Sequence, residues 1–139
     1  MNISCQRPYR DALDRLRASG LRPTRQRLAL ARLLFGDRHR HVTAELLHSE
    51  AMEAAIPVSL ATIYNTLHQF TEAGLLREIV VDSARCYFDT NTADHHHFFH
   101  VRTGELTDIP DSDVVLSLLP PPPPGTKINR VEIIVRIED

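Results

Sequence analysis

The chain has 139 residues, of which 42% are apolar and 24% are charged, and its net charge is −2. This length suits one ordinary domain or two very small ones, and no apolar stretch approaches the roughly 20 residues that cross a bilayer, which excludes a transmembrane protein. Residues 1–9 lack the apolar core of a secretion signal, so we expect a cytoplasmic chain without a membrane partner. Its two cysteines, Cys5 and Cys86, supply neither a disulfide framework nor a cysteine-based zinc site, so any metal needs nitrogen and oxygen ligands.

Charge is unevenly distributed along the chain. Residues 1–40 contain ten arginines and three acids, a local charge of +7, whereas residues 85–139 contain five basic residues and nine acids, a local charge of −4. Guanidinium groups match phosphate oxygens in bidentate geometry, so the arginine-rich segment is suited to phosphate contact. A solvated helical face gives the same pattern, and charge alone leaves both interpretations open.

The first half of the chain predicts four short helices. Apolar residues recur at helical spacing, beginning with Tyr9, Leu13 and Leu16. Residues that favour N-caps precede the later helices, and residues that end helices follow each of the four. The predicted caps are Thr24, Thr43 and Ser59, and the predicted ends lie at Gly20, Gly36, Pro57 and Gly74.

After Gly74 the pattern changes to short apolar runs at residues 75–81 and 86–88, separated by turn-like residues, which predicts a β-hairpin. Helices followed directly by a hairpin are typical of a winged helix-turn-helix, in which the helix before the hairpin enters the major groove of DNA. Further along, we expect a polar hinge, two strands, a helix, an extended run of five prolines and a last strand. These lie at residues 89–94, 97–101, 106–109, 111–119, 120–124 and 131–137.

The predicted fold class is therefore α+β, with an N-terminal winged helix-turn-helix domain followed by a small α/β dimerisation domain. We expect the winged-helix DNA-binding domain at residues 1–84, the hinge at 85–94 and the dimerisation and metal-sensing domain at 95–139. About fifty residues are too few for a stable independent core, so the second domain is expected to form a homodimer.

Residues 59–67 carry the pattern of a DNA-reading helix. Leu60, Ile63 and Leu67 fall on one face, while small and polar residues project from the other. Such groups let a helix sit deep in a groove, where Tyr64 and Asn65 can touch a thymine methyl or bond to a base edge. An ordinary capped surface helix fits this stretch equally well, but the arginines upstream and the hairpin downstream favour DNA reading.

A histidine-rich segment, residues 94–97, indicates metal binding. In an extended chain His95 and His97 share one face, while Asp94 and His96 share the other. Imidazoles and carboxylates at such spacing suit Fe²⁺, Mn²⁺ or Zn²⁺. A solvated polar loop is the alternative, which the nearby Asp89 and Asp108, together with His41, make less favourable.

Four further segments stand in register: residues 20–27 (GLRPTRQR), 41–45 (HVTAE), 61–67 (ATIYNTL) and the histidine triplet followed by Gly104. Together they resemble the ferric uptake regulator family of metal-sensing repressors. The resemblance implies a regulatory metal between the two domains, with spacing similar to that of the peroxide-sensing branch. The family's zinc cysteines would begin at His100 and Thr103, so a structural zinc site with four cysteine ligands is excluded. The implied ligands are His41, Asp89, His95, His97 and Asp108.

Three features of the second half are a histidine triplet followed by two phenylalanines, the absence of the zinc cysteines and a short last strand. In these features the chain resembles the iron response regulator subfamily, which is described as sensing haem. The resemblance implies a haem or second metal site at Asp94, His96 and His100, with His96 free for an axial bond. Phe98 and Phe99 would cover a porphyrin or pack in the dimer sheet. The Cys-Pro motif of some members is absent, because Gln6 follows Cys5.

We therefore expect a non-enzymatic, homodimeric, iron-responsive transcription factor that controls iron and haem homeostasis genes through an A·T-rich, pseudo-palindromic operator in double-stranded DNA. Haem or a haem-delivering protein would be a further partner. One alternative is a peroxide sensor in which bound Fe²⁺ leads to oxidation of His41 or His95. A remote alternative is a small metal-dependent hydrolase, although no H-E-x-x-H pattern or general base stands out. In the leading hypothesis Arg22, Arg25 and Arg27 contact phosphates, and Ser59, Thr62, Tyr64 and Asn65 face the groove.

Overall fold

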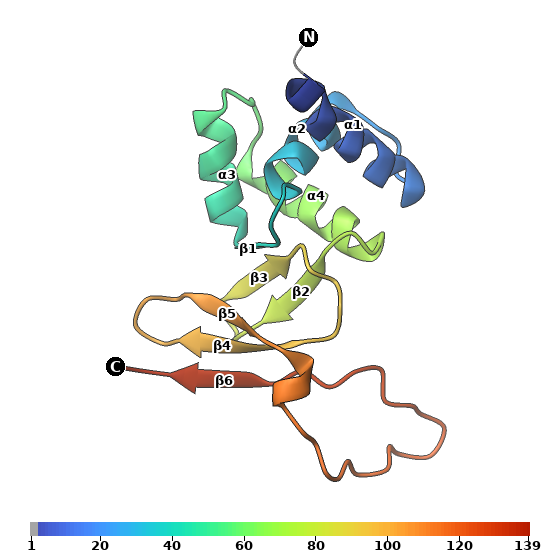
Figure 1. The fold of residues 1–139 in the computed structure, drawn as a ribbon, viewed down its shortest axis with the longest axis vertical. Helices are drawn as coiled ribbons and strands as arrows, with labels where there is room; N and C mark the ends of the chain where they lie inside the picture. Colours follow the sequence, from blue (N-terminus) through green and yellow to red (C-terminus); the bar gives the residue numbers. More distant parts are fainter. Residues whose placement is uncertain (1–2) are drawn as a thin grey trace. The chain divides into compact units, whose positions relative to one another are not determined.

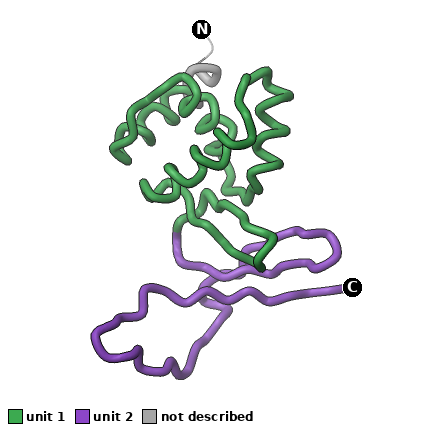
Figure 2. Tube along the Cα trace, turned by 180° about the vertical axis from the view of Figure 1, so that it is seen from behind, with its two compact units in different colours: residues 1–92 green, residues 93–139 purple. Residues whose placement is uncertain are grey.

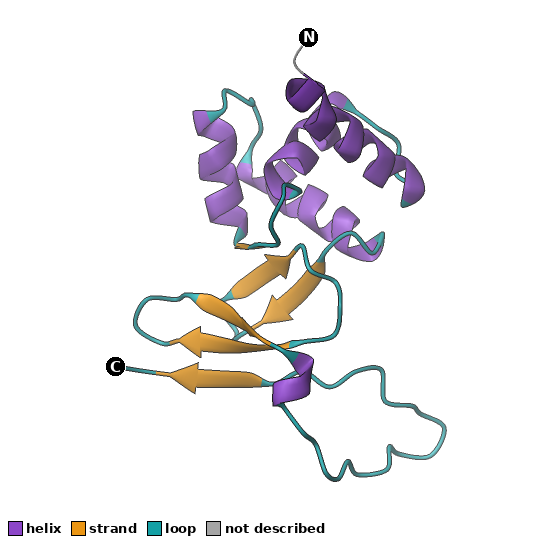
Figure 3. Cartoon of the chain, viewed as in Figure 1, coloured by secondary structure: helices purple, strands orange, loops and turns teal. Residues whose placement is uncertain are grey.

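The computed structural model describes the backbone of residues 3–139 and the side chains of residues 9–139. It comprises two compact units, unit 1 at residues 1–92 and unit 2 at residues 93–139 (Figure 2). Over residues 3–139, four α-helices and two small sheets confirm the predicted α+β class (Figure 3). The finer domain boundaries remain a prediction, and the interpretation of Cys5 concerns a side chain outside the described residues.

Unit 1 begins with the four expected helices. Among the described residues, no helix is long and apolar enough to cross a membrane. Three of them start at the predicted caps. The hydroxyl oxygens of Thr24, Thr43 and Ser59 accept backbone N–H groups three residues ahead at 3.1–3.2 Å, which satisfies donors that a helix start leaves open. The helices are α1 (Ile3–Ala18), α2 (Arg25–Leu34), α3 (Ala44–Glu53) and α4 (Leu60–Glu72), labelled in Figure 1.

The helices of unit 1 enclose a single apolar core. Phe35 and Phe70 pack with ring centroids 6.4 Å apart, at the ends of α2 and α4. Leu60, which we placed on the apolar face of α4, is 36% exposed, whereas Ile63 and Leu67 on that face are fully buried. On α3, Leu47 is fully buried and Leu46 is 45% exposed. Fully buried members of the core include Leu16, Leu30, Leu34, Leu47, Ile63, Leu67, Phe70 and Phe88.

The sheet of unit 1 contains the expected hairpin and one strand that we did not predict. β2 (Arg77–Val80) and β3 (Cys86–Asp89) are antiparallel, and β1 (His41–Val42) joins the other side of β3, giving the order β1-β3-β2. A strand of two residues is too short to be recognised from the alternation of apolar and polar residues. Asp89, which we placed in a polar hinge, is the last residue of β3 and lies opposite His41.

The sheet of unit 2 has the strand order β5-β4-β6. β4 (His96–His100) pairs antiparallel with β5 (Leu106–Ile109) and parallel with β6 (Ile134–Ile137). His97 lies opposite Asp108 in the first of these ladders. Apolar side chains such as Phe99, Leu106 and Ile109 are buried in this unit.

The helix predicted at residues 111–119 is wrong. Only a 3₁₀ turn, η1 (Asp111–Asp113), forms, and the chain then continues without regular structure through the prolines to β6 (Figure 3). Val114 and Val115 are β-branched, and Pro120 disfavours helical geometry at Leu119. Val115 and Leu118 are 85% and 86% exposed, so no core supplies the packing that stabilises a short helix.

We predict that Ala55→Gly stabilises the protein. Ala55 follows α3 with a φ of +58°, and the N–H of Ile56 then bonds back to the Ala51 carbonyl at 2.8 Å. Only glycine adopts this left-handed conformation without steric cost, so the free energy of unfolding in urea should rise by roughly 0.5–1 kcal/mol. The control is Ala54→Gly, where φ is −85° and glycine should lower stability. Equal effects of the two substitutions would contradict the argument.

Candidate functional site

One candidate pair of metal ligands lies in unit 1. The antiparallel ladder places His41 of β1 opposite Asp89 of β3, and His41 Nε2 is 3.1 Å from Asp89 Oδ2. The Asp89 side chain is 0% exposed, and its Oδ1 accepts the backbone N–H of Asn91 at 2.8 Å. Strand pairing and this hydrogen bond together fix the direction in which the carboxylate points.

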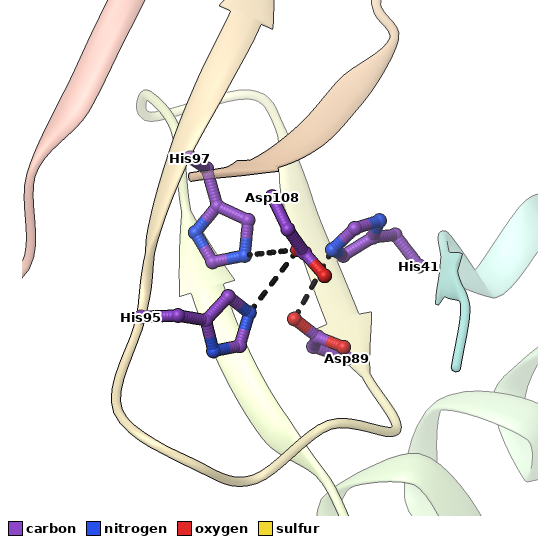
Figure 4. Close-up of side chains that lie close together, drawn as sticks. All are labelled: His41, Asp89, His95, His97 and Asp108. Carbon is purple, nitrogen blue, oxygen red and sulfur yellow. Dashed lines mark ion pairs between the residues drawn. The ribbon is translucent and has the colours of Figure 1, made fainter. Parts of the chain in front are cut away.

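Three further candidate ligands lie in unit 2. His95 directly precedes β4, His97 lies within it, and Asp108 faces His97 from β5. The Nε2 atoms of His95 and His97 are 3.1 and 3.3 Å from the same oxygen, Asp108 Oδ1. The two rings therefore share one side of the strand, as the alternation predicted, with centroids 4.5 Å apart (Figure 4).

The hydrogen bonding of His95 indicates that a cation belongs beside it. The Nδ1–H of His95 donates to the carbonyl oxygen of Ala93 at 2.6 Å, because that oxygen can only accept. In the neutral ring, Nε2 then presents a lone pair to the Asp108 carboxylate, which also has only lone pairs to offer. A proton or a metal ion relieves this repulsion. The contact with Ala93 is also the kind of support that orients a histidine ligand.

The donor atoms fit a small divalent ion. Bonds of about 2.0–2.2 Å to nitrogen and oxygen put neighbouring ligand atoms about 3.0–3.4 Å apart. The three ion-pair distances within the units, 3.1, 3.1 and 3.3 Å, fall in this range. Three imidazoles and two carboxylates, drawn in Figure 4, contain no soft sulfur and suit Fe²⁺, Mn²⁺ or Zn²⁺.

The residues proposed for haem or a second metal have separate partners. His96 is buried, its Nδ1 accepts the N–H of Ile133 at 3.2 Å, and its Nε2 is 3.8 Å from Asp111 Oδ1. His100 Nε2 is 3.2 Å from Asp139 Oδ1, while Asp94 is exposed. The described part of the chain does not gather Asp94, His96 and His100 into one ligand cluster.

Sequence reasoning missed the partners of His100. Its Nδ1 accepts the backbone N–H groups of Arg102 and Thr103, and the Arg102 guanidinium binds the Asp139 carboxylate, which lowers the pKa of Asp139. His100 and Asp139 are far apart in the sequence, and only the parallel pairing of β4 with β6 brings them together. No local pattern signals such a pair.

The candidate nucleic-acid interface is the first half of α4. Tyr64 and Asn65 are exposed, Thr62 is half-buried, and Ile63 and Leu67 hold the opposite face in the core. The Ser59 hydroxyl already caps the helix and donates to Thr62 Oγ1 at 3.0 Å. It therefore has a structural role in addition to the groove contact predicted for it.

The predicted phosphate-binding arginines differ in their surroundings. Arg22 and Arg25 are exposed, whereas Arg27 is half-buried. Nη1 of Arg27 donates to the Arg22 carbonyl and Nη2 to Gln69 Oε1, both at 3.0 Å. Arg27 thus ties the connection before α2 to α4, a contact that sequence reasoning missed, and it keeps further N–H groups for other acceptors.

Helices before a hairpin, an exposed polar helix face and nitrogen–oxygen ligand sets define a metal-binding regulator of the winged-helix class. The family model of the ferric uptake regulator family matches residues 18–117. The peroxide-responsive repressor PerR of Staphylococcus aureus is 33% identical over 106 residues, which cover 76% of this chain and 70% of that protein. The chain belongs to the ferric uptake regulator family, whose members are metal-responsive, DNA-binding transcription regulators.

Solved structures agree with this assignment. The ferric uptake regulator of Pseudomonas aeruginosa, solved with manganese, is similar at a TM-score of 0.69 and 26% identity, covering 92% of this chain and 97% of that one. The ferric uptake regulator Fur of Helicobacter pylori, described as having three functional metal-binding sites, has a TM-score of 0.69 at 15% identity over 94% and 91% of the two chains, which shows the shared fold. Membership of a family of regulators leaves the hydrolase interpretation without support.

We predict that the Cys86 thiol is unreactive, which would remove it as a soft ligand or redox sensor. Burial, with a hydrogen bond from Sγ to Glu78 Oε1 at 3.0 Å, raises the pKa of Cys86 to about 12. At neutral pH its thiolate fraction is then roughly 1000-fold below that of an ordinary cysteine, so alkylation should be slower by a similar factor. The rate is measured in a Cys5→Ser background against a free thiol. Glu78→Gln should speed the reaction, and a rate equal to that of free cysteine would contradict the prediction.

Proposed function

We propose that this chain is a homodimeric, iron-responsive transcriptional regulator in which one divalent ion, held jointly by the ligands of both units, sets the affinity for DNA. The observation that carries the proposal is the pair of preoriented donor sets, His41 with Asp89 and His95 and His97 with Asp108. Iron is the physiological ion in this proposal, and the iron response regulator subfamily is the branch to which we assign the chain.

We infer that the two donor sets share one ion because each set alone has too few ligands. Unit 1 offers two ligands and unit 2 offers three, whereas Fe²⁺ and Mn²⁺ in oxygen and nitrogen sites commonly take more. Asp89 ends β3 and His95 directly precedes β4, so the five residues between them, 90–94, keep the two Cα atoms within about 20 Å of each other. A bound ion would place positive charge beside both Asp89 and Asp108.

The DNA side of the proposal rests on α4 and the arginines before it. Arg22, Arg25 and Arg27 would contact phosphates, which position the protein without reading sequence. The residues facing the major groove would be Ser59, Thr62, Tyr64 and Asn65. Two copies related by a twofold axis would read an A·T-rich, pseudo-palindromic operator, with half-site spacing set by the dimer.

Exposed apolar residues on unit 2 support the homodimer. Phe98 on β4 and Val135 and Ile137 on β6 are 36–38% exposed, although they lie on adjacent strands of one sheet. A contiguous apolar surface of this kind is typical of a protein interface. A second copy of the chain would cover the same surface on both partners.

Haem is the second effector in this proposal, with Asp94, His96 and His100 as its candidate residues and free haem or a haem-delivering protein as its source. His96 is the member that could bind the iron axially, although Ile133 and Asp111 contact its two ring nitrogens. A bond to haem iron requires loss of one of these contacts. Haem binding would therefore disturb the contact that β4 makes through His96 with Ile133 or with Asp111.

We predict that metal and DNA affinities are reciprocally linked. Mn²⁺, as an air-stable substitute for Fe²⁺, should tighten binding to the preferred duplex by at least about fivefold, the lower end of typical coupling between sites. Asp108→Asn should remove this dependence and weaken Mn²⁺ binding, because the carboxylate oxygen between His95 and His97 is lost. The measurement is fluorescence anisotropy at fixed salt, together with calorimetric metal titration.

The matched control for that experiment is Asp113→Asn, an exposed acid that lies outside the candidate ligand group. It should behave as the wild type. Equal DNA affinity of metal-free and metal-loaded wild-type protein would overturn the proposed switch. In the same assay, haem should release the duplex, and an unchanged footprint with bound haem would remove haem from the proposal.

A peroxide sensor is the second candidate function, favoured by the similarity to the peroxide-responsive repressor of S. aureus and by the ligand set of three histidines and two aspartates. If this function is correct, peroxide treatment of the Fe²⁺-loaded protein should add one oxygen to His41 or His95. Peptide mass spectrometry detects the addition, and Mn²⁺-loaded protein is the control. Unmodified histidines after complete iron oxidation would exclude the peroxide sensor.

A further inference from the structure

An acidic residue on α3 holds the exposed tyrosine of the candidate reading helix. The Tyr64 hydroxyl, in the second turn of α4, donates a hydrogen bond of 2.7 Å to Oε1 of Glu45, in the first turn of α3. Tyr64 is 38% exposed and Glu45 is exposed as well. The contact therefore lies on the surface that α4 presents to solvent.

The electrostatics of both groups agree with this direction of donation. The hydrogen bond to Glu45 raises the pKa of Tyr64, and the hydrogen bond from Tyr64 lowers the pKa of Glu45. At neutral pH the phenol thus keeps its proton and the carboxyl group stays ionised. An ionised carboxylate can only accept hydrogen bonds, so the hydrogen bond to Glu45 uses the single O–H donor of the Tyr64 phenol.

This contact changes what Tyr64 can recognise. A phenol offers one donor and two lone pairs, and with the donor engaged only the lone pairs remain. In the major groove the exocyclic amino groups of adenine and cytosine are donors, whereas guanine N7 and O6 and thymine O4 are acceptors. Phosphate oxygens are acceptors too. The hydroxyl can then bond to adenine or cytosine, but not to guanine, thymine or the backbone.

We propose that Glu45 is a specificity-determining positioning residue: by holding the Tyr64 proton, it makes this side chain an acceptor that selects an adenine or cytosine amino group at one operator position. The inference rests on the proposed function, because it takes α4 as the helix in the groove. It assigns to Glu45 a role in reading DNA without contact to the base.

A purely structural role for the contact explains less. α3 and α4 are already joined through a core that includes the fully buried Leu47, Ile63 and Leu67, and Thr43 caps α3. One exposed hydrogen bond adds little stability to such packing. Moreover, a carboxylate at this place repels phosphates, so it weakens DNA binding in general. Its removal should then increase non-specific affinity while it lowers selectivity, a combination that loss of packing does not produce.

The test begins with selection of a preferred duplex from a random library by the Mn²⁺-loaded wild-type chain. Each base pair of that duplex is then changed singly, and affinities are measured for the wild type, Glu45→Ala, Tyr64→Phe and the double variant. In the wild type, replacing one adenine or cytosine by guanine or thymine should cost about tenfold, within the range of a typical mismatch. In Glu45→Ala this cost should fall below about twofold.

Glu53→Ala is the matched control, because Glu53 is an exposed acid at the opposite end of the same helix. It should retain the wild-type selectivity at every position. The double variant should lose no more selectivity at that position than either single variant, since both remove the same hydrogen bond. Normal circular dichroism spectra and unfolding midpoints confirm that all variants fold.

Titration of the phenol by ultraviolet absorbance supplies a readout that does not involve DNA. The difference between the wild type and Tyr64→Phe isolates Tyr64 from Tyr9 and Tyr87. In Glu45→Ala the pKa of Tyr64 should fall toward that of an ordinary tyrosine. An unchanged titration, or an unchanged selectivity profile in Glu45→Ala, overturns the inference alone. A wild-type protein that selects no sequence overturns the proposed function and this inference with it.

Discussion

The arrangement of the candidate ligands in unit 1 depends on one buried carboxylate, Asp89. An ionised carboxylate without solvent costs several kcal/mol unless polar partners surround it. The Asn91 N–H and the His41 ring supply two such partners, and both are present because β1 pairs with the end of β3. A ladder of two residues thus decides whether a histidine and an aspartate, 48 positions apart, form a ligand pair.

The same ladder is anchored to the helices. Arg40, next to His41, donates through its guanidinium to the Glu50 carboxylate of α3 and to the Leu33 carbonyl of α2. Its backbone exchanges hydrogen bonds with Thr90, which extends the pairing beyond Asp89. A charge-assisted contact with two oxygens holds a fixed geometry better than a single hydrogen bond. The candidate ligand pair and the helices of unit 1 are therefore directly connected, as the proposed switch from metal to DNA requires.

Local signals in the sequence predicted most of the helical unit because its elements obey local rules. Thr24, Thr43 and Ser59 cap helices wherever they precede an apolar stripe, and the hairpin follows from short apolar runs around a turn. The prediction failed at residues 111–119, where apolar residues without a core to cover did not form a helix. Leu60 was misplaced for a related reason, since helical spacing does not say how far along a helix its neighbours will cover the apolar face.

The sequence by itself determined the family, the α+β class and the residue types of the ligand sets, because motif spacing, strand alternation and the donor chemistry of histidine and aspartate are properties of short segments. Only the tertiary structure decided that His41 faces a fully buried Asp89, that one oxygen of Asp108 serves both His95 and His97, and that Glu45 occupies the proton of Tyr64. These contacts join different strands and helices. Their geometry comes from strand register and helix packing, which no local pattern encodes.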